Sequence, residues 1–301
     1  MQHDQFEEAP VRELKILKPI AKLENAAFLD PLVKPIRNAV LALAKPRALE
    51  DVLHGTPVGH PVHPAIMLAP AGAWTSVAML DLLPGTEQAA RALAGIGVVT
   101  AVPTAVTGYA DWARLDPPHQ RVGLVHQAAN LSAAALYAWS WVERGRGNLM
   151  RGKVLGFLGF GAVGLGGYLG GHLAYRQAAG VTHTENLAHH FPPGWQHLAA
   201  LDDLPERTLL RREVAGQPLL VYRRGTGVRV LSNVCTHLSG PLDEGKLIEG
   251  DEPCVQCPWH QSVFSLDTGE AVHGPATAPE PAFAVRVSNG QVEVQLPNAA
   301  G

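Results

Sequence analysis

Charged residues are scarce in this chain. Asp, Glu, Lys and Arg make up 17% of its 301 residues, whereas about 25% is usual for a soluble domain. The net charge is −3, so the chain lacks the excess of basic residues that nucleic-acid binding requires. We therefore expect no nucleic-acid partner. The low charge and the 47% hydrophobic content instead leave room for a membrane-embedded part.

Cysteine is also scarce, since the chain has only Cys235, Cys254 and Cys257. If two of the three bind a metal, no intramolecular disulfide can form, which agrees with a reducing compartment. Residues 1–10 are polar and acidic, and no pair of arginines precedes the first apolar stretch. We therefore expect no secretory signal peptide.

The pattern that decides the interpretation lies between residues 235 and 260. Cys235-x-His237 and Cys257-x-x-His260 each offer one thiolate and one imidazole, beside residues that favour turns. Two Cys and two His are the ligands of a Rieske [2Fe–2S] centre, in which two His replace two Cys on one iron. The same set of ligands also suits zinc, and the spacing alone leaves both metals open.

The residues around these pairs favour the iron–sulfur interpretation. The two loops resemble the ligand loops of Rieske ferredoxin-like domains, with the sequences C-T-H-L-S-G-P-L from Cys235 and C-P-W-H-Q-S-V-F-S-L-D-T-G-E from Cys257. A third loop, G-P-A-T from Gly274, resembles that family's proline-bearing loop. The resemblance implies that Cys235 and Cys257 bind one iron, and that His237 and His260 bind the other.

The resemblance covers about residues 195–297 and has two departures. The span from His237 to Cys257 is slightly longer than is usual, and Gln261 stands where the family prefers Gly. Neither departure removes a ligand.

The resemblance also implies which residues surround the cluster. Ser262 matches a Ser that donates a hydrogen bond to a cluster sulfur in high-potential members, but Phe264 stands where those members have a Tyr. Pro275 belongs to the third loop. Gly240 and Trp259 occupy the positions at which one class carries bridging Cys residues. Because a hydroxyl donor is missing, we predict an intermediate or low reduction potential.

Four apolar stretches precede this region, at about residues 65–83, 89–109, 124–142 and 154–173. Each is close to the roughly 20 residues that cross a bilayer, so we predict a multi-pass membrane bundle. Four crossings place both ends of the bundle on the same side of the membrane. Basic residues near the helix ends are more numerous on that side, which favours the cytoplasm for that side and for the C-terminal domain.

The fourth stretch contains Gly159-x-Gly161-x-x-Gly164, which has the spacing of a dinucleotide-binding fingerprint. No strand precedes it, so that interpretation fails. We expect close helix packing at these glycines and at the pairs Gly166/Gly170 and Gly167/Gly171.

Several polar residues fall on one side of the predicted bundle, and polar groups at membrane depth usually mark a site. The candidates are His60, His63, Asp111, His126 and His172. They are candidates for a b-type haem, which takes His ligands, or for a quinone pocket. The alternative is structural, because polar residues also join helices by hydrogen bonds.

Residues 54–182 carry three motifs that resemble a family of small bacterial membrane proteins, domain of unknown function 2231. The motifs are G-H-P-V-H-P, G-Y-A-D-W and G-G-H-L-A-Y-R. The resemblance implies four membrane helices and supplies no activity.

The pattern becomes β from residue 195 on. Short apolar runs flank Arg224-Gly225-Thr226-Gly227 and Ser288-Asn289-Gly290, and both turns predict hairpins. In the N-terminal segment, Leu32, Ile36, Val40 and Leu43 have the spacing of an amphipathic helix.

We therefore predict a multidomain α + β protein in which a four-helix transmembrane bundle is followed by a small antiparallel all-β Rieske domain. The expected divisions are an N-terminal segment (1–58), the membrane domain (59–180), a linker (181–194) and the Rieske domain (195–298). We expect a membrane-anchored carrier of single electrons between a reductase, a membrane haem or quinone, and an acceptor such as an oxygenase. It would be an electron-transfer component of the inner membrane rather than a stand-alone catalyst. The alternative is a non-enzymatic redox sensor.

Overall fold

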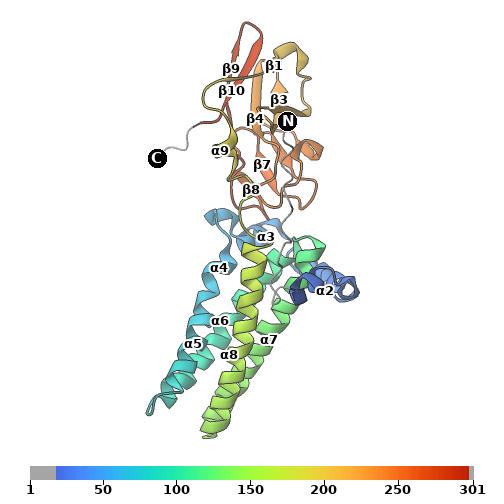
Figure 1. Ribbon diagram of the computed structural model, residues 1–301. Coiled ribbons are helices and arrows are strands. Elements are labelled where there is room, and N and C mark those ends of the chain that lie inside the picture. The colour runs from blue at the N-terminus through green and yellow to red at the C-terminus, as the bar shows by residue number, and fades with distance from the viewer. Residues whose placement is uncertain (1–17, 298–301) are drawn as a thin grey trace, which may run out of the picture.

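The computed structural model describes residues 18–297. Residues 1–17 of the expected N-terminal segment, and residue 298 of the expected Rieske domain, lie outside the described residues. The chain forms two parts placed end to end, a helical part followed by an antiparallel β part (Figure 1). This order confirms the predicted sequence of helical and all-β regions.

Short helices begin the helical part. They are α1 (Lys18–Glu24), η2 (Ala27–Leu29), α2 (Asp30–Leu43), α3 (Arg47–His54) and η3 (Thr56–Val58). α2 projects sideways near the junction of the two parts (Figure 1). The apolar face predicted for it is only partly used, because Val33, Ile36 and Val40 pack in a cluster with the long helices, whereas Leu32 and Leu43 are exposed.

The helices that follow run side by side below the β part (Figure 1). A single turn, α4 (Val62–Ile66), leads into α5 (Leu68–Leu80), α6 (Glu87–Ala113), α7 (Pro117–Gly145) and α8 (Leu149–Tyr175). Three of the predicted apolar stretches lie inside α6, α7 and α8. The first predicted stretch, 65–83, ends early at Leu80, and Met67, which joins α4 to α5, has helical angles (φ −64°, ψ −18°) and donates its N–H to the carbonyl of His63.

The structure gives two candidate membrane spans within the described residues, α6 and α8. α5 alone reaches about 20 Å at 1.5 Å per residue, which is short of a hydrocarbon core of about 30 Å, but α4 extends it through Met67, whose backbone is helical. α7 is long enough but carries polar side chains along its length, including Gln120, His126 and Gln127.

Some of the glycines of α8 allow close packing, as predicted. A Cβ atom at Gly159 would lie 2.8 Å from the ring of Tyr137, and one at Gly166 would lie 2.4 Å from the Asn130 side chain. Gly167 has no neighbouring atom within 4 Å. Of the two predicted small-residue pairs, the one that begins at Gly166 therefore faces α7, and Gly167 faces open space.

A buried ion pair joins the helices at the end far from the β part. Arg144 Nη1 donates to Asp81 Oδ1 at 2.8 Å and Arg144 Nη2 to Asp81 Oδ2 at 2.5 Å. The Arg144 and Asp81 side chains are 0% and 1% exposed. Arg144 Nε also donates to Ser140 Oγ at 3.0 Å, so α7 is tied to the end of α5 by a charge pair that water does not reach.

Within residues 18–297, the β part contains three antiparallel sheets (Figure 1). The first joins β1 (Gln196–Ala200), β10 (Gln291–Gln295) and β9 (Ala284–Ser288) in that order. The second joins β2 (Leu209–Val214), β3 (Gln217–Arg224) and β4 (Gly227–Ser232). The third joins β5 (Lys246–Ile248), β6 (Cys254–Gln256), β7 (Val263–Ser265) and β8 (Ala271–His273).

Both predicted hairpins are confirmed. β3 pairs with β4 from Arg224 and Gly227 onward, and β9 pairs with β10 from Ser288 and Gln291 onward. At the second turn Asn289 has φ 51° and Gly290 has φ 75°. Asn and Gly are the residues that adopt this left-handed conformation most readily.

The segment that was expected to be a linker packs on the β part. It contains α9 (Leu187–His190), and Leu187 and Phe191 are buried in the core that the first two sheets share. The Phe191 ring lies 4.9 Å from that of Phe283. His189 and His190 are exposed.

Candidate metal centre

Two loops of the same construction carry the four predicted ligands. In the first, which follows β4, the N–H of Cys235 donates to the carbonyl of Gly240, and the N–H of Ser239 donates to that of Cys235. In the second, between β6 and β7, Cys257 and Ser262 form the first of these bonds, and Gln261 and Cys257 form the second. Each loop thus folds its Cys and its His toward the same face.

The matching loops explain the departure at Gln261. Gln261 has φ 69°, and the corresponding Ser239 has φ 62°. Glycine takes this left-handed conformation without strain, whereas another residue pays about 1–2 kcal/mol. The structure therefore keeps the loop geometry with Gln at a position that Gly fits best.

The structure brings the four predicted ligands together. Cys235 and Cys257 are 1% and 2% exposed, and both belong to one buried cluster. The imidazole centroids of His237 and His260 lie 5.0 Å apart. The structure therefore pairs thiol with thiol and imidazole with imidazole.

The electrostatics of the site suit metal ligands. The hydrogen bond from the neighbouring thiol lowers the pKa of Cys257 to about 7, with help from the N–H groups of Trp259 and His260. The same bond and burial raise the pKa of Cys235. Burial lowers the pKa of both His237 and His260, so both rings are neutral at pH 7, as metal binding requires.

An unpaired atom is a second sign that a group belongs here. Nδ1 of His237 is buried and has no hydrogen-bond partner among the described residues, although a buried polar atom is normally paired. Within residues 18–297, no group of three or more His, Cys, Asp or Glu side chains is placed to hold one metal ion. In a Rieske centre each iron takes only two protein ligands, so two pairs of side chains fit such a cluster.

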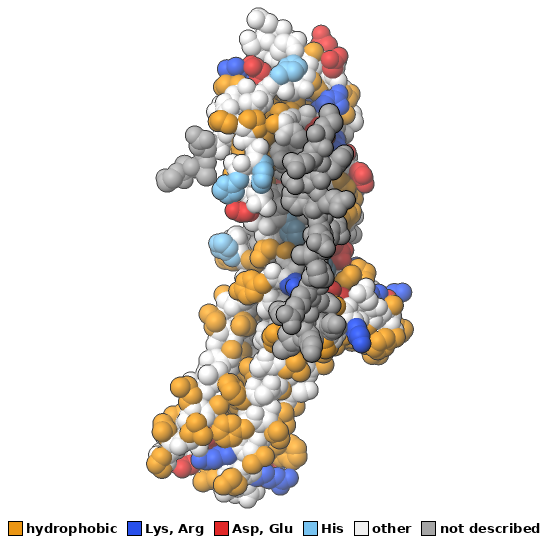
Figure 2. Space-filling model, viewed as in Figure 1, with side chains coloured by type: hydrophobic (Ala, Val, Ile, Leu, Met, Phe, Trp, Pro, Cys, Tyr) orange, Lys and Arg blue, Asp and Glu red, His pale blue; other side chains and the backbone are white. Residues whose placement is uncertain are grey.

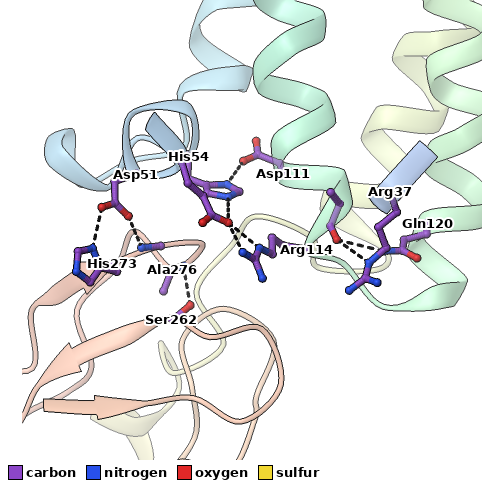
Figure 3. Close-up of polar contacts among 12 residues, drawn as sticks. Arg37, Asp51, His54, Asp111, Arg114, Gln120, Ser262, His273 and Ala276 are labelled. Carbon is purple, nitrogen blue, oxygen red and sulfur yellow. Dashed lines mark hydrogen bonds and ion pairs between the residues drawn. The ribbon is translucent and has the colours of Figure 1, made fainter. Parts of the chain in front are cut away.

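The other residues predicted around the cluster line the same region. Ser262 is fully buried, and its Oγ accepts a hydrogen bond from the N–H of Ala276 at 2.9 Å, which Figure 3 shows. Phe264 is fully buried in the core that contains both cysteines. Pro275 lines a small cavity of about 40 Å³ together with His237.

The helical part touches the site at contacts that the sequence did not reveal, and we call them the seam. Asp51 of α3 accepts hydrogen bonds from the N–H of Gly274 at 3.0 Å and from Nδ1 of His273 at 2.8 Å (Figure 3). Asp116, which precedes α7, places its Oδ1 3.3 Å from Nε2 of His260. The edge of the candidate centre that carries the predicted ligand His260 therefore rests on the helical part.

A polar network lies behind the seam and takes in Asp111, one of the predicted membrane-site residues (Figure 3). Nδ1 of His54 is 2.8 Å from Asp111 Oδ1, and Arg114 Nε donates to Glu50 Oε1 at 2.7 Å. Burial lowers the pKa of His54, but the bonds to Asp111 and Glu50 outweigh burial and raise it overall. His54 was missed in the sequence because nothing in its neighbourhood distinguishes it.

The five predicted membrane-site residues do not form one site. His60 is exposed. His63 Nδ1 contacts the carbonyl of Thr104 at 2.9 Å, His126 Nδ1 that of Gly166 at 2.8 Å, and His172 Nε2 pairs with Glu24 at 2.7 Å. Within the described chain, no hydrogen bond or ion pair joins any two of the five.

The β part and the helical part each match a different protein family. Residues 194–292 match the model of the Rieske [2Fe-2S] domain. The anthranilate 1,2-dioxygenase ferredoxin subunit of Burkholderia cepacia is 32% identical over 102 residues, which are 34% of this chain and 92% of that protein. The chain belongs to the Rieske [2Fe–2S] family.

Other relatives of this Rieske protein are also ferredoxins. Ferredoxin CarAc of Metapseudomonas resinovorans is 36% identical over 33% of this chain and 92% of its own length. The solved ferredoxin of carbazole 1,9a-dioxygenase from Nocardioides aromaticivorans is 29% identical, with a TM-score of 0.32 over 34% of this chain and 96% of that one. Ferredoxin relatives of dioxygenase systems support an electron-carrying Rieske protein.

The preceding part matches a second family model. Residues 59–183 match the description "Predicted membrane protein (DUF2231)". This Rieske protein thus combines, in one chain, a ferredoxin-like domain with a region of a membrane-protein family, as the motifs predicted.

Proposed function

We propose that this chain is a membrane-anchored Rieske protein that carries single electrons between a reductase or a membrane redox partner and an acceptor such as an oxygenase. One observation carries the proposal. Two loops with the same backbone hydrogen bonds bring two buried thiols and two neutral imidazoles to one face of a small β part.

Four residues would hold a [2Fe–2S] cluster, with Cys235 and Cys257 on one iron and His237 and His260 on the other. When bound, the cluster supplies one-electron transfer at a potential above that of an all-Cys cluster. The chain contributes burial, neutral imidazoles and backbone N–H groups directed at Cys257. With Ser262 present and no hydroxyl at Phe264, the potential should be intermediate or low.

The helical part would anchor the protein in the inner membrane as a multi-pass bundle of α5–α8. Apolar side chains are spread over the face of these helices that Figure 2 shows, and only 17% of the apolar window of α6 and 28% of that of α8 are buried. A soluble protein rarely exposes so much contiguous apolar surface. At the far end, Trp139 and Trp141 are about half exposed and lie under Arg151 and Arg91, as interfacial aromatic residues do.

This arrangement supports the divisions expected from the sequence, at residues 59–180 for the membrane domain and 195–298 for the Rieske domain. The excess of basic residues at the helix ends next to the β part favours the cytoplasmic side for the Rieske domain. Redox partner proteins would then approach from the cytoplasm.

A second function, the redox sensor, is favoured by the seam. Asp116 of the helical part lies beside the predicted ligand His260, so a change of cluster state has a direct route to the helices. In this case the reduced protein would change its contacts with a partner without exchanging electrons with it.

The test is spectroscopic. Full-length protein, purified anaerobically in detergent, should show a Rieske EPR signal after reduction with dithionite, and Cys257→Ser should abolish it. A Soret band in the same sample would add a b-type haem, for which His63 and His126 are the residues to replace first. Absence of the EPR signal, with zinc found instead, would refute the proposal, and reduction without electron transfer to any acceptor would favour the sensor.

A further inference from the structure

Asp116 stands at a position where its side chain would ordinarily cap the N-terminus of its own helix, α7. It is the N-cap residue of α7, and Asp is among the strongest N-cap residues because its carboxylate accepts the free N–H groups of the first turn. Here the side chain makes no such bond, although the backbone has the extended conformation of an N-cap, with φ −73° and ψ 158°. The carboxylate is therefore free to act elsewhere.

The carboxylate instead faces the predicted metal centre. Its Oδ1 lies 3.3 Å from Nε2 of His260, and the His260 side chain is only 11% exposed. Nδ1 of His260 makes no hydrogen bond with any described residue, and it remains available for the metal. A carboxylate on the far nitrogen of a ligand imidazole is the usual means by which proteins fix the ring and raise its basicity.

The other charged groups nearby have partners of their own. Arg114 donates to Glu50, and Arg37 Nε donates to the carbonyl of Ala113 at 3.0 Å. Their charges reach His260 through space, but among the described residues the charged side chain within ion-pair distance of its ring is Asp116. The negative charge that touches the ligand imidazole comes from Asp116.

We propose that Asp116 is a positioning residue of the cluster, through which the helical part sets the reduction potential of the Rieske domain. The inference rests on the proposed function, because it requires His260 to be a cluster ligand. Its physical basis is electrostatic. A carboxylate beside the ligand ring favours the oxidised cluster, which carries one more positive charge, so Asp116 lowers the potential.

The experiment compares two substitutions of the same kind at the seam. Asp116→Asn removes the charge next to the ligand, and Asp51→Asn removes a charge that contacts Gly274 and His273 but no predicted ligand. The midpoint potential of each full-length variant is measured in detergent at one pH, by redox titration of the Rieske EPR signal. Asp116→Asn should raise the midpoint clearly and change the g-values, and Asp51→Asn should shift the midpoint much less.

Further variants protect the test against misfolding. Asp116→Ser keeps a good helix cap without the charge and should raise the midpoint as Asn does, whereas Asp116→Glu should restore a value near that of the wild type. An unchanged midpoint in both Asn and Ser variants would overturn the inference, as would equal shifts in the Asp116 and Asp51 variants, which would mean that the seam had only loosened. A wild-type protein without a Rieske signal would instead refute the proposed function itself.

Discussion

Arg144 and Arg146 lie two residues apart on the same helix end, and replacing each by alanine removes the same atoms from very different surroundings. Arg144 is fully buried and bonded to buried Asp81 by two hydrogen bonds. Arg146 is 67% exposed and pairs with Glu143 at 3.2 Å. The pair of variants therefore measures what burial does to an ion pair in the helical part.

Arg144→Ala should destabilise the protein by about 3–5 kcal/mol, because it leaves the Asp81 carboxylate buried without a countercharge. Arg146→Ala should cost less than about 1 kcal/mol, as exposed pairs do. The double variant Asp81→Leu/Arg144→Met should recover much of the loss, since no buried charge remains.

The assay is thermal unfolding in detergent, followed by the helical circular dichroism. If Arg144→Ala and Arg146→Ala had similar melting temperatures, the pair at Asp81 would be hydrated and the reasoning would be wrong. The same conclusion would follow if the double variant melted lower than Arg144→Ala.

Three further predictions concern the Rieske domain. Ser262→Ala should lower the melting temperature by an amount equivalent to about 1–3 kcal/mol, because the buried N–H of Ala276 loses its acceptor; unchanged melting would contradict this. Phe264→Tyr should raise the midpoint potential, since a hydroxyl donor near the cluster favours the reduced state, and an EPR-monitored titration that found a lower midpoint would count against it. Burial raises the pKa of Glu280 from 4.5 to about 8. The folded protein then binds more protons than the unfolded chain between these values, so stability should fall as pH rises from about 5 to 8. Glu280→Gln should flatten this dependence in melting curves, while still accepting the N–H of Thr236, and a parallel slope would disprove the assignment.

The parts of the fold that could be predicted were those with local signals. Asn289-Gly290 specifies a hairpin by its own backbone preferences, and the structure has that hairpin. The ligand loops were recognisable because Cys and His stand at fixed spacing beside turn-forming residues. The apolar stretches also became helices, and the early end of α5 at Leu80 went unpredicted because hydropathy alone does not register it.

The seam had no local signal. Asp51 and His273 are 222 residues apart, and each looks like an ordinary surface residue in its own neighbourhood. His172 seemed a candidate for a membrane cofactor, and its contact with Glu24 of α1 was invisible for the same reason. Asp116 precedes two prolines, a sequence that by itself indicates only a break between helices, and the structure shows that its carboxylate lies beside His260.

The segment between α8 and β1 touches the first ligand loop on its way. The N–H of His183 donates to the carbonyl of Thr236 at 3.0 Å, and its ring lies 3.1 Å from Ser239 Oγ. Because this segment joins the two parts, each sees the other at an effective concentration in the millimolar range. Contacts too weak to hold two separate proteins together therefore suffice here. A soluble partner that competed for the His260 edge would have to bind it more tightly than the helical part, which is joined to the β part in the same chain.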